Sequence, residues 1–342
     1  MNAVNLTAEQ LATIGELLRA QLGGAPAAIR ATPASGGQSN PTFFLDWDGG
    51  TAVLRKQPDG ELAPSAHAID REFRLLEALA PSDVPVPRPI LYHADREMLG
   101  TPFYLMERLE GRIFDQASLP GVAPRERGVM FEAMAGALAK LHKFDWRAAG
   151  LDDFGRAGDY YARQFRRWKR FWAEQREAEN PDLDYILNWI EERPFPAEDS
   201  GIAHGDFRLA NVMFAKDAPE VVGILDWELA TLGPPAADLG FSATCYYTRP
   251  DENGGLLGLD LPTLGIPAPD AYTAAYFKAV GQHRTLTLFE QVFALFRASA
   301  GSESIAARGR AGQGTGSDSA LFGQRMARAY ARGARMLIDR DG

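Results

Sequence analysis

The first twenty or so residues carry a helical pattern of apolar positions. Leu11, Ile14 and Leu18 recur at the spacing of one helical face, and they follow Thr7 and Gln10. Those two residues stand three apart, as in a capping box that closes a helix N-terminus. The pattern predicts a short helix that docks by its apolar side.

Strand-like and helical stretches then alternate as far as residue 108. TFFLDWDG and TAVLRKQP are rich in β-forming residues and flank a turn at residues 48–50, which predicts a hairpin. Apolar residues return to helical spacing from Ile69 to Leu79, and the run FYLM at residues 103–106 predicts another strand. We therefore expect a small mixed sheet that carries one helix.

Beyond residue 109 the apolar spacing is mainly helical. The ranges with this spacing are 125–143, 160–179, 271–280, 285–298 and 321–337. Residues 298–320 are rich in Gly and Ser, which predicts a loop before the last helix. The expected fold class is α+β, with a strand-rich small lobe at residues 1–108 and a helix-rich large lobe at residues 109–342.

Composition narrows the possible functions. The 342 residues are 46% hydrophobic, enough for a substantial core, and their formal charge of −9 disfavours general binding to nucleic acid or anionic membranes. Cys245 is the only cysteine, and its apolar neighbours predict a buried, unreactive thiol. We expect no signal peptide and no membrane span, hence a cytoplasmic protein.

The segment HGDFRLANVMF places several polar groups in an otherwise apolar stretch. Asp206 and Asn211 have the separation of the Asp and Asn in a kinase catalytic loop, where the Asp faces the substrate hydroxyl and the Asn ligates magnesium. Arg208 stands between them, where a cation could reach a transferred phosphoryl group. Asp206 and Arg208 are therefore the candidate catalytic residues.

A second polar cluster follows an apolar strand at residues 221–225. Asp226 ends that strand, as does the metal-binding Asp of a kinase, so Asn211 and Asp226 are the candidate Mg²⁺ ligands. Glu228 could ligate metal, contact substrate or brace the site. Asp238 is expected to cap a helix or to brace the catalytic loop as a buried carboxylate.

The histidines are interpreted as structural. His142 follows a helical apolar face and is expected to close a buried helix, and His204 is expected to hold the catalytic loop by a hydrogen bond to backbone or to Asp226. The alternative is a metallohydrolase with His204, Asp206 and Asp226 as ligands. The remaining histidines lack metal-ligand spacing, which disfavours it.

HGDFRLANVMF followed by ILDWELATLGPPAADLG resembles the aminoglycoside phosphotransferase and choline kinase-like family, whose members share a protein-kinase-like two-lobed fold. The segments GGQSNPTFFL, VLRKQP and YYARQFRRW are most similar to its branch of kinase-like domains fused to acyl-CoA dehydrogenases. One departure is Gly233-Pro234-Pro235, where relatives commonly have Gly-Asp-Pro. It leaves substrate placement open.

The resemblance implies a nucleotide site for ATP or GTP in the first lobe. Lys56 stands where the family carries a phosphate-binding lysine, and Glu72 stands where a helix carries its salt-bridge partner. Arg55 competes with Lys56, because neighbouring strand residues point to opposite faces.

The same resemblance assigns further nucleotide contacts. Gly36, Gly37 and Ser39 lie where the phosphate-covering loop is expected, although alone they would be interpreted as a hairpin turn. Met106 would border the adenine pocket, and the backbones of the connector residues Glu107 and Leu109 would pair with the purine edge.

The acceptor is predicted least closely. Tyr160, Arg163, Arg167 and Trp168 belong to a basic, aromatic helix in the region where the family recognises acceptors. Such a helix suits an anionic or acyl-CoA-type acceptor better than a polycationic aminoglycoside. The other interpretation is an amphipathic helix with aromatics in the core and arginines in water.

The function expected is a small-molecule kinase that transfers the γ-phosphoryl group of ATP or GTP, with Mg²⁺, to a hydroxyl group. Its partners would be a nucleotide and a small hydroxylated metabolite, with no nucleic acid and no membrane. The alternatives are an aminoglycoside O-phosphotransferase and a nucleotide-binding pseudokinase that regulates a partner.

Overall fold

The computed structural model describes residues 6–23, 28–34, 40–58, 68–176, 178–312 and 318–341. The chain divides into two compact units, residues 1–110 and residues 111–342. The first is built on an antiparallel sheet and the second is mainly helical, which confirms the expected α+β class.

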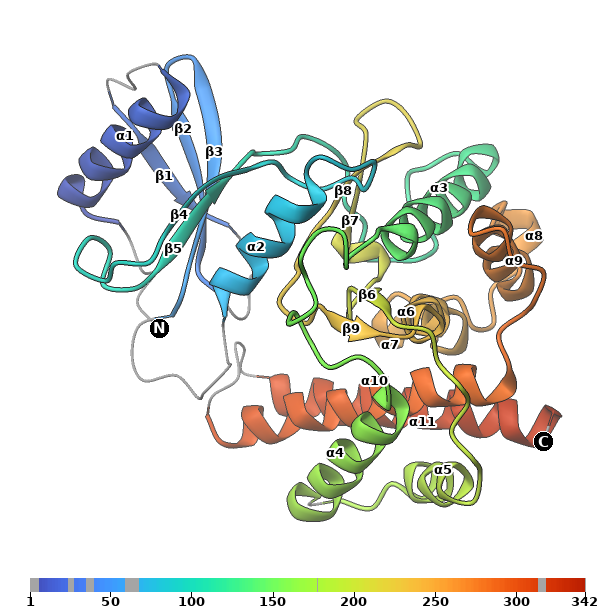
Figure 1. Ribbon diagram of the computed structural model, residues 1–342. Helices are drawn as coiled ribbons and strands as arrows, with labels where there is room; N and C mark the ends of the chain where they lie inside the picture. The colour runs from blue at the N-terminus through green and yellow to red at the C-terminus, as the bar shows by residue number, and fades with distance from the viewer. Residues whose placement is uncertain are drawn as a thin grey trace. The chain divides into compact units, whose positions relative to one another are not determined.

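Within its described residues, the first unit has five strands and two helices (Figure 1). In chain order they are α1 (Ala8–Leu22), β1 (Arg30–Pro33), β2 (Thr42–Trp47), β3 (Gly50–Lys56), α2 (Ile69–Leu79), β4 (Pro89–His93) and β5 (Phe103–Met106). The strands pair antiparallel in the order β1-β2-β3-β5-β4. The predicted hairpin is the β2–β3 pair.

Each face of this sheet carries one helix. Helix α1 begins with the predicted capping box, in which the Thr7 hydroxyl accepts from the Gln10 N–H at 3.2 Å. Its buried Ile14 packs in one cluster with Leu54 of β3. Helix α2 packs on the other face, where Phe73 lies 5.8 Å from the ring of Tyr104 on β5. Strand alternation therefore assigns odd and even residues of β3 to different helices.

The second unit holds the remaining helices and two short sheets (Figure 1). Its elements are α3 (Pro124–Lys143), α4 (Tyr160–Gln175), α5 (Pro181–Glu191), β6 (Gly201–Ala203), η1 (Leu209–Asn211), β7 (Val212–Phe214), β8 (Val221–Ile224), β9 (Thr231–Gly233), α6 (Pro235–Ser242), η2 (Ala243–Tyr247), α7 (Pro250–Asn253), α8 (Leu261–Leu264), α9 (Pro269–Ala279), α10 (Leu288–Arg310) and α11 (Ser319–Asp341). Strand β6 pairs with β9, and β7 pairs with β8.

An aromatic cluster forms a large part of the core of this unit. Tyr161 of α4 contacts Phe293 of α10 edge to face at 4.8 Å between ring centroids, and Phe296 continues the contact along α10. Helix α4 ends at Gln175, earlier than predicted, because the backbone of Arg176 is extended. These ring contacts pack α4 against α10 and so join α4 to the core of the unit.

The predicted loop at residues 298–320 is wrong for most of its length. Helix α10 continues to Arg310 and α11 begins at Ser319, with residues 313–317 outside the described part of the chain. The two helices lie side by side in Figure 1, and a Cβ added to Gly323 of α11 would lie 2.5 Å from the backbone nitrogen of Ala306. Small residues in this segment permit close helix packing, which composition alone does not distinguish from a loop.

Candidate phosphoryl-transfer site

The HGD segment forms a tight loop directly after β6. Gly205 has a φ of 84°, in the left-handed region, and a Cβ there would lie 2.5 Å from the carbonyl oxygen of Leu229. Glycine is the residue that satisfies both conditions without strain. The backbone path that leads to Asp206 therefore depends on Gly205.

His204 is bound through both of its ring nitrogens. Its Nε2 lies 2.9 Å from the carbonyl oxygen of Leu225, and its Nδ1 lies 3.2 Å from the backbone N–H of Asp206. A neutral ring protonated at Nε2 donates the first bond and accepts the second. The ring thus ties the loop to the end of β8 and has no nitrogen left for a metal.

Asp238 of α6 braces the same loop from within the core. It is 0% exposed, and its two carboxylate oxygens accept from the backbone N–H groups of His204 at 2.5 Å and Gly205 at 2.9 Å. Burial alone would raise the pKa of Asp238, but the hydrogen bond and electrostatic attraction of His142 and the Gly205 N–H together lower it. The geometry is that of the predicted bracing carboxylate.

His142 belongs to this buried network. Its Nε2 lies 3.4 Å from Asp238, and its Nδ1 lies 2.7 Å from the Tyr276 hydroxyl. Because its side chain is buried and bound on both sides, His142 supports the loop and does not face solvent.

Asp206 and Asn211 meet at the surface of the loop. The Asn211 side-chain nitrogen donates to both the carbonyl and the carboxylate Oδ2 of Asp206, each at 2.9 Å. Asp206 remains 23% exposed, and the 48% exposed Arg208 reaches to 3.4 Å from its carboxylate. The predicted carboxylate, amide and cation therefore lie together.

Asp226 follows β8, the strand that pairs with the strand after Asn211. Val212 is opposite Ile224, and the N–H of Leu225 donates to the Asn211 carbonyl at 2.8 Å. Asp226 has a φ of 65°, a conformation that costs about 1–3 kcal/mol and is concentrated at functional sites. The hairpin thus brings Asn211 and Asp226 to neighbouring strand ends.

The oxygen groups at these strand ends suit magnesium. Because the Asn211 nitrogen is bound to Asp206, its Oδ1 is the atom that would ligate a cation, and Asp226 would supply a carboxylate. Mg²⁺ commonly binds one or two protein oxygens and completes its shell with water and phosphate. Both ring nitrogens of His204 are already hydrogen-bonded, which disfavours the metallohydrolase in which His204 would ligate metal.

Glu228 lies in the turn that follows Asp226. Trp227 anchors this turn, since its Nε1 donates to the Ile224 carbonyl at 3.0 Å and its ring lies 4.6 Å from that of His204. Glu228 itself is half-buried, and its role stays a prediction.

A buried carboxylate also organises the first unit. Glu72 of α2 is 3% exposed and forms an ion pair with the Nε of Arg55 at 3.0 Å. It also accepts from the Asn40 side chain at 2.8 Å and from the Tyr104 hydroxyl at 3.0 Å. Sequence reasoning did not assign Asn40 or Tyr104 to this cluster.

The ion pair with Glu72 that was expected of Lys56 is made by Arg55. Arg55 is opposite Tyr104 on the sheet face that carries α2, whereas Lys56 is opposite Phe103, which belongs to the core under α1. The Lys56 ammonium group instead donates to the Leu99 carbonyl at 3.3 Å. Strand alternation decides between the two once the helix positions are known.

The other predicted nucleotide contacts are described in part. Met106 ends β5, and the N–H of Glu107 donates to the Arg88 carbonyl at 2.8 Å. That N–H is therefore engaged, so a purine contact by Glu107 would have to use its carbonyl. Leu109 follows in the connector, and Gly36, Gly37 and Ser39 lie outside the described residues.

The four candidate acceptor residues separate into two pairs along α4. Tyr160 is 2% exposed, which leaves little of it for an acceptor to contact, and the Arg163 guanidinium donates to the carbonyls of Gly158 and Arg156. Arg167 and Trp168 instead line a hollow of about 180 Å³. The buried Trp168 Nε1 has no hydrogen-bond partner in the described part of the chain.

Arg297 of α10 was missed by sequence reasoning. Its guanidinium donates to the Gly205 carbonyl and, at 2.8 Å, to the Tyr160 hydroxyl. An arginine within the apolar run FALFRASA was the available signal. It did not indicate which loop the side chain would contact.

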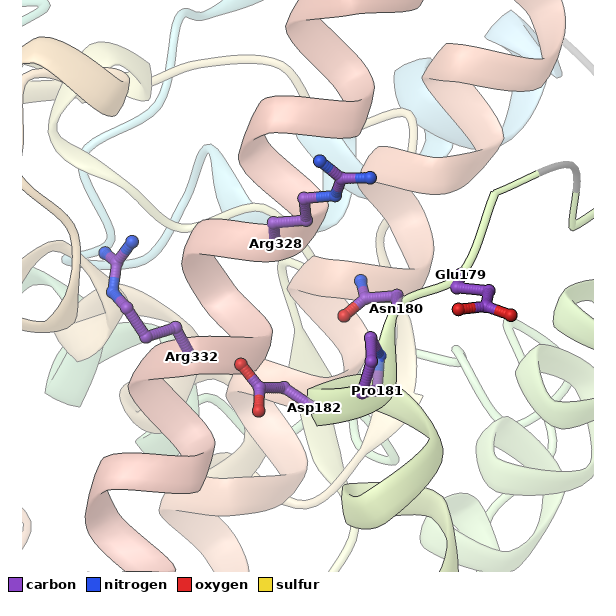
Figure 2. A pocket seen from close by; sticks show the side chains of 6 residues that line it. All are labelled: Glu179, Asn180, Pro181, Asp182, Arg328 and Arg332. Atoms are coloured by element: carbon purple, nitrogen blue, oxygen red, sulfur yellow. The ribbon is translucent and has the colours of Figure 1, made fainter.

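A larger hollow, of about 640 Å³, lies away from these residues (Figure 2). Arg328 and Arg332 of α11 and the start of α5 form its walls, and the full lining is Glu179, Asn180, Pro181, Asp182, Arg328 and Arg332. Positive and negative side chains are equally represented, and the Arg332 guanidinium is held by Glu252 at 2.7 Å. It includes none of the predicted site residues.

Comparison with known proteins agrees with this geometry. Residues 30–283 match the model of the phosphotransferase enzyme family. Acyl-CoA dehydrogenase family member 10 of Mus musculus is 38% identical over 281 residues, which are 81% of this chain and 26% of that protein. The chain thus spans about a quarter of this relative's length, and the expected resemblance to the dehydrogenase-linked branch is confirmed.

Solved structures show the same fold. A Ralstonia eutropha protein assigned as an aminoglycoside phosphotransferase superposes with a TM-score of 0.83 at 33% identity, covering 95% of this chain and 98% of that one. Spectinomycin phosphotransferase, in complex with ADP and spectinomycin, has a TM-score of 0.64 at 10% identity, with 95% and 98% coverage. Among the residues that the structure describes, no helix has the length and apolar character needed to cross a membrane.

Proposed function

The chain belongs to the phosphotransferase enzyme family, and from that premise we propose that it transfers the γ-phosphoryl group of ATP or GTP to a hydroxyl of a small metabolite. It is a phosphotransferase with an alcohol group as acceptor. The observation that carries the proposal is the Asp206–Asn211 contact on a loop braced by buried side chains.

Asp206 would orient the acceptor hydroxyl and take its proton. As the acceptor oxygen attacks phosphorus, a new O–P bond forms and the P–O bond to the departing nucleoside diphosphate breaks. The hydroxyl proton passes late to the carboxylate of Asp206. Arg208, exposed beside that carboxylate, would place positive charge near the phosphoryl oxygens.

Asn211 and Asp226 would hold Mg²⁺ at the strand ends. A bound Mg²⁺ supplies charge that neutralises the phosphate oxygens of the nucleotide. In the first unit, Arg55 held by Glu72 replaces Lys56 as the proposed phosphate contact. The ADP in the spectinomycin phosphotransferase complex supports a nucleotide as co-substrate.

For the acceptor, we favour an anionic or acyl-CoA-type molecule. Arg167, Arg170 and Trp168 line the α4 hollow, where guanidinium groups and an indole N–H suit phosphate or carboxylate. Trp168 lies eight residues beyond Tyr160, the residue that contacts Arg297, so the hollow is about 12 Å along the helix from that point. An acceptor that reaches both the α4 hollow and the neighbourhood of Arg297 must be long.

An aminoglycoside is the second candidate acceptor. The name of the Ralstonia eutropha structure favours it. A polycationic substrate is expected to require carboxylates at its site, whereas the α4 hollow carries two arginines and one glutamate. We therefore place it second.

The test is a phosphoryl-transfer screen with labelled ATP and GTP against hydroxyacyl-CoAs, choline analogues, sugars and aminoglycosides. Wild-type protein should label at least one acceptor, and Asp206→Asn should label it at least about 100-fold more slowly. Tight Mg²⁺-dependent nucleotide binding without transfer to any acceptor would instead support the pseudokinase. Labelling of an aminoglycoside alone would reverse the order of the two candidates.

The α4 assignment is tested with a matched pair of variants. Arg167→Ala should raise the KM for a long anionic acceptor about tenfold. Arg166→Ala, an exposed neighbour that does not line the hollow, should leave it unchanged. Equal effects of the two changes would show that the helix merely faces solvent.

A further inference from the structure

The peptide group that joins Gly205 to Asp206 is held at both of its polar atoms. Its N–H donates to Nδ1 of His204 at 3.2 Å, and its carbonyl oxygen accepts from the guanidinium of Arg297. The preceding N–H, that of Gly205, donates to Asp238 at 2.9 Å. The orientation of this peptide plane sets the direction in which the Asp206 side chain leaves the loop.

Arg297 reaches the loop from a distant part of the chain. It lies on α10, 92 residues after Gly205, and its other terminal nitrogen donates to the Tyr160 hydroxyl at 2.8 Å. The guanidinium packs over the Phe241 ring at 4.7 Å from its centroid. The loop at Gly205, helix α4 and helix α6 therefore converge on this side chain of α10.

The charge of Arg297 is maintained by its surroundings. Burial alone would lower the pKa of the guanidinium, but Tyr160, Asp238 and Asp206 together raise it above its ordinary value. A cation beside the Gly205 carbonyl makes that hydrogen bond stronger than a neutral donor would.

We propose that Arg297 is a positioning residue for Asp206: it fixes the 205–206 peptide plane and so aims the carboxylate at the acceptor hydroxyl. The proposal rests on the phosphoryl-transfer role of Asp206. Glycine at position 205 is the most permissive residue for backbone rotation, so the loop needs a clamp from outside. Protein kinases of the H-R-D type have an arginine within the motif itself, whereas here α10 supplies the cation.

The forked shape of the guanidinium explains why arginine suits this position. One nitrogen binds the Gly205 carbonyl while the other binds the Tyr160 hydroxyl, so α4 fixes the orientation of the clamp. The single ammonium of a lysine cannot present two donors in that fixed geometry. Arg297→Lys should therefore restore part of what Arg297→Ala loses.

The experiment compares Arg297→Ala with a matched control, Arg332→Gln. Arg332 is a partly buried arginine of α11 that binds Glu252 through two hydrogen bonds of 2.7 Å and does not contact the loop. For each full-length variant, three quantities are measured: amide hydrogen exchange in peptides within residues 201–214, ATP affinity with Mg²⁺, and turnover of ATP. Turnover is measured with the best acceptor, or as ATP hydrolysis by water if no acceptor has been found.

For Arg297→Ala we expect faster exchange at the Gly205 and Asp206 amides, an unchanged nucleotide Kd and a kcat lower by about 10–100-fold. Guanidinium ion, at concentrations that leave the melting temperature unchanged, should restore part of the kcat. Arg332→Gln should show none of these local effects even where it lowers stability.

Two results would overturn the proposal. One is exchange in residues 201–214 that does not differ between Arg297→Ala and Arg332→Gln. The other is wild-type kcat in the folded Arg297→Ala protein. Hydrogen exchange does not depend on turnover. If the protein transferred no phosphate, the exchange data would still show whether Arg297 holds the loop, while the missing transfer would refute the proposed function separately.

Discussion

Glu72 and Asp238 are both buried carboxylates, but they hold different kinds of group. Glu72, in the first unit, contacts side chains: the Arg55 guanidinium, the Asn40 amide and the Tyr104 hydroxyl. Asp238, in the second unit, accepts from the backbone N–H groups of His204 and Gly205. The first fixes the position of a cation, and the second fixes the path of the main chain.

This difference predicts a division of kinetic effects. A cation that contacts a nucleotide affects binding, so changes around Glu72 should act mainly on the nucleotide KM. A main-chain path that aims the catalytic carboxylate affects the chemical step, so changes around Asp238 should act mainly on kcat.

The largest effect is expected for Asp238→Asn. An amide offers one acceptor where the carboxylate offers two, so one buried N–H loses its partner and a donor faces a donor. The free energy of unfolding should fall by about 3–5 kcal/mol. Urea denaturation measures this loss, and kcat of the remaining folded protein should fall more than the nucleotide KM rises. An increase in the nucleotide KM with no change in kcat would contradict the expected division of kinetic effects between the two carboxylates.

Gly323→Ala should lower stability without touching the loop. The added methyl group would lie 2.5 Å from the Ala306 nitrogen and 2.6 Å from the Ser302 carbonyl oxygen, so α10 and α11 must move apart. We expect a loss of about 1–3 kcal/mol in the free energy of unfolding. At a temperature where the variant is folded, kcat should match wild type. A parallel loss of kcat would mean that activity follows the stability of the unit as a whole.

Arg55→Gln and Lys56→Gln form a matched pair that tests the first unit. Arg55→Gln removes the guanidinium that forms an ion pair with Glu72, and the nucleotide KM should rise about tenfold, equivalent to about 1.4 kcal/mol. Lys56→Gln, on the opposite face, should change the KM by about twofold or less. Steady-state kinetics at saturating acceptor gives both values. A larger rise in the nucleotide KM for Lys56→Gln than for Arg55→Gln would indicate that Lys56 contacts the phosphates.

Acid should weaken the second unit through Asp238. Because its pKa is lowered on folding, the group contributes stability above its unfolded pKa of about 3.9, and that contribution is lost as the pH falls through the lower folded value. Unfolding free energies of wild type and Asp238→Asn should therefore converge below about pH 4. A constant difference between them across that range would show that folding does not lower the pKa of Asp238.

The arrangement of the HGD loop could be predicted because its signal is local. His204, Asp206 and Asn211 stand within eight residues, and the loop's own hydrogen bonds join them. Asp226 comes directly after a strand whose partner follows Asn211. Because the two strands form a short hairpin, the proximity of Asn211 and Asp226 could also be predicted from nearby sequence. Cys245 is half-buried and not fully buried as expected, but burial raises the pKa of its thiol to about 12 and leaves it the poor nucleophile that was predicted.

The features that were missed depend on distant packing. Arg55 and Lys56 have equal claims until the sheet face that carries α2 is known. Arg297 lies 92 residues from the carbonyl that it binds, and no local pattern records that contact. The Gly- and Ser-rich end of α10 was interpreted as a loop, because Gly and Ser are common both in loops and where two helices pack closely.

The central claim is that Asp206 acts in the chemical step and not in nucleotide binding. The direct measurement is the Mg²⁺-dependent nucleotide Kd and the turnover number of Asp206→Asn, determined on the same preparation. We predict a Kd within about twofold of wild type and a turnover number lower by about 10²–10⁴-fold. Retained turnover, or a Kd that weakens in step with the lost activity, would contradict the account.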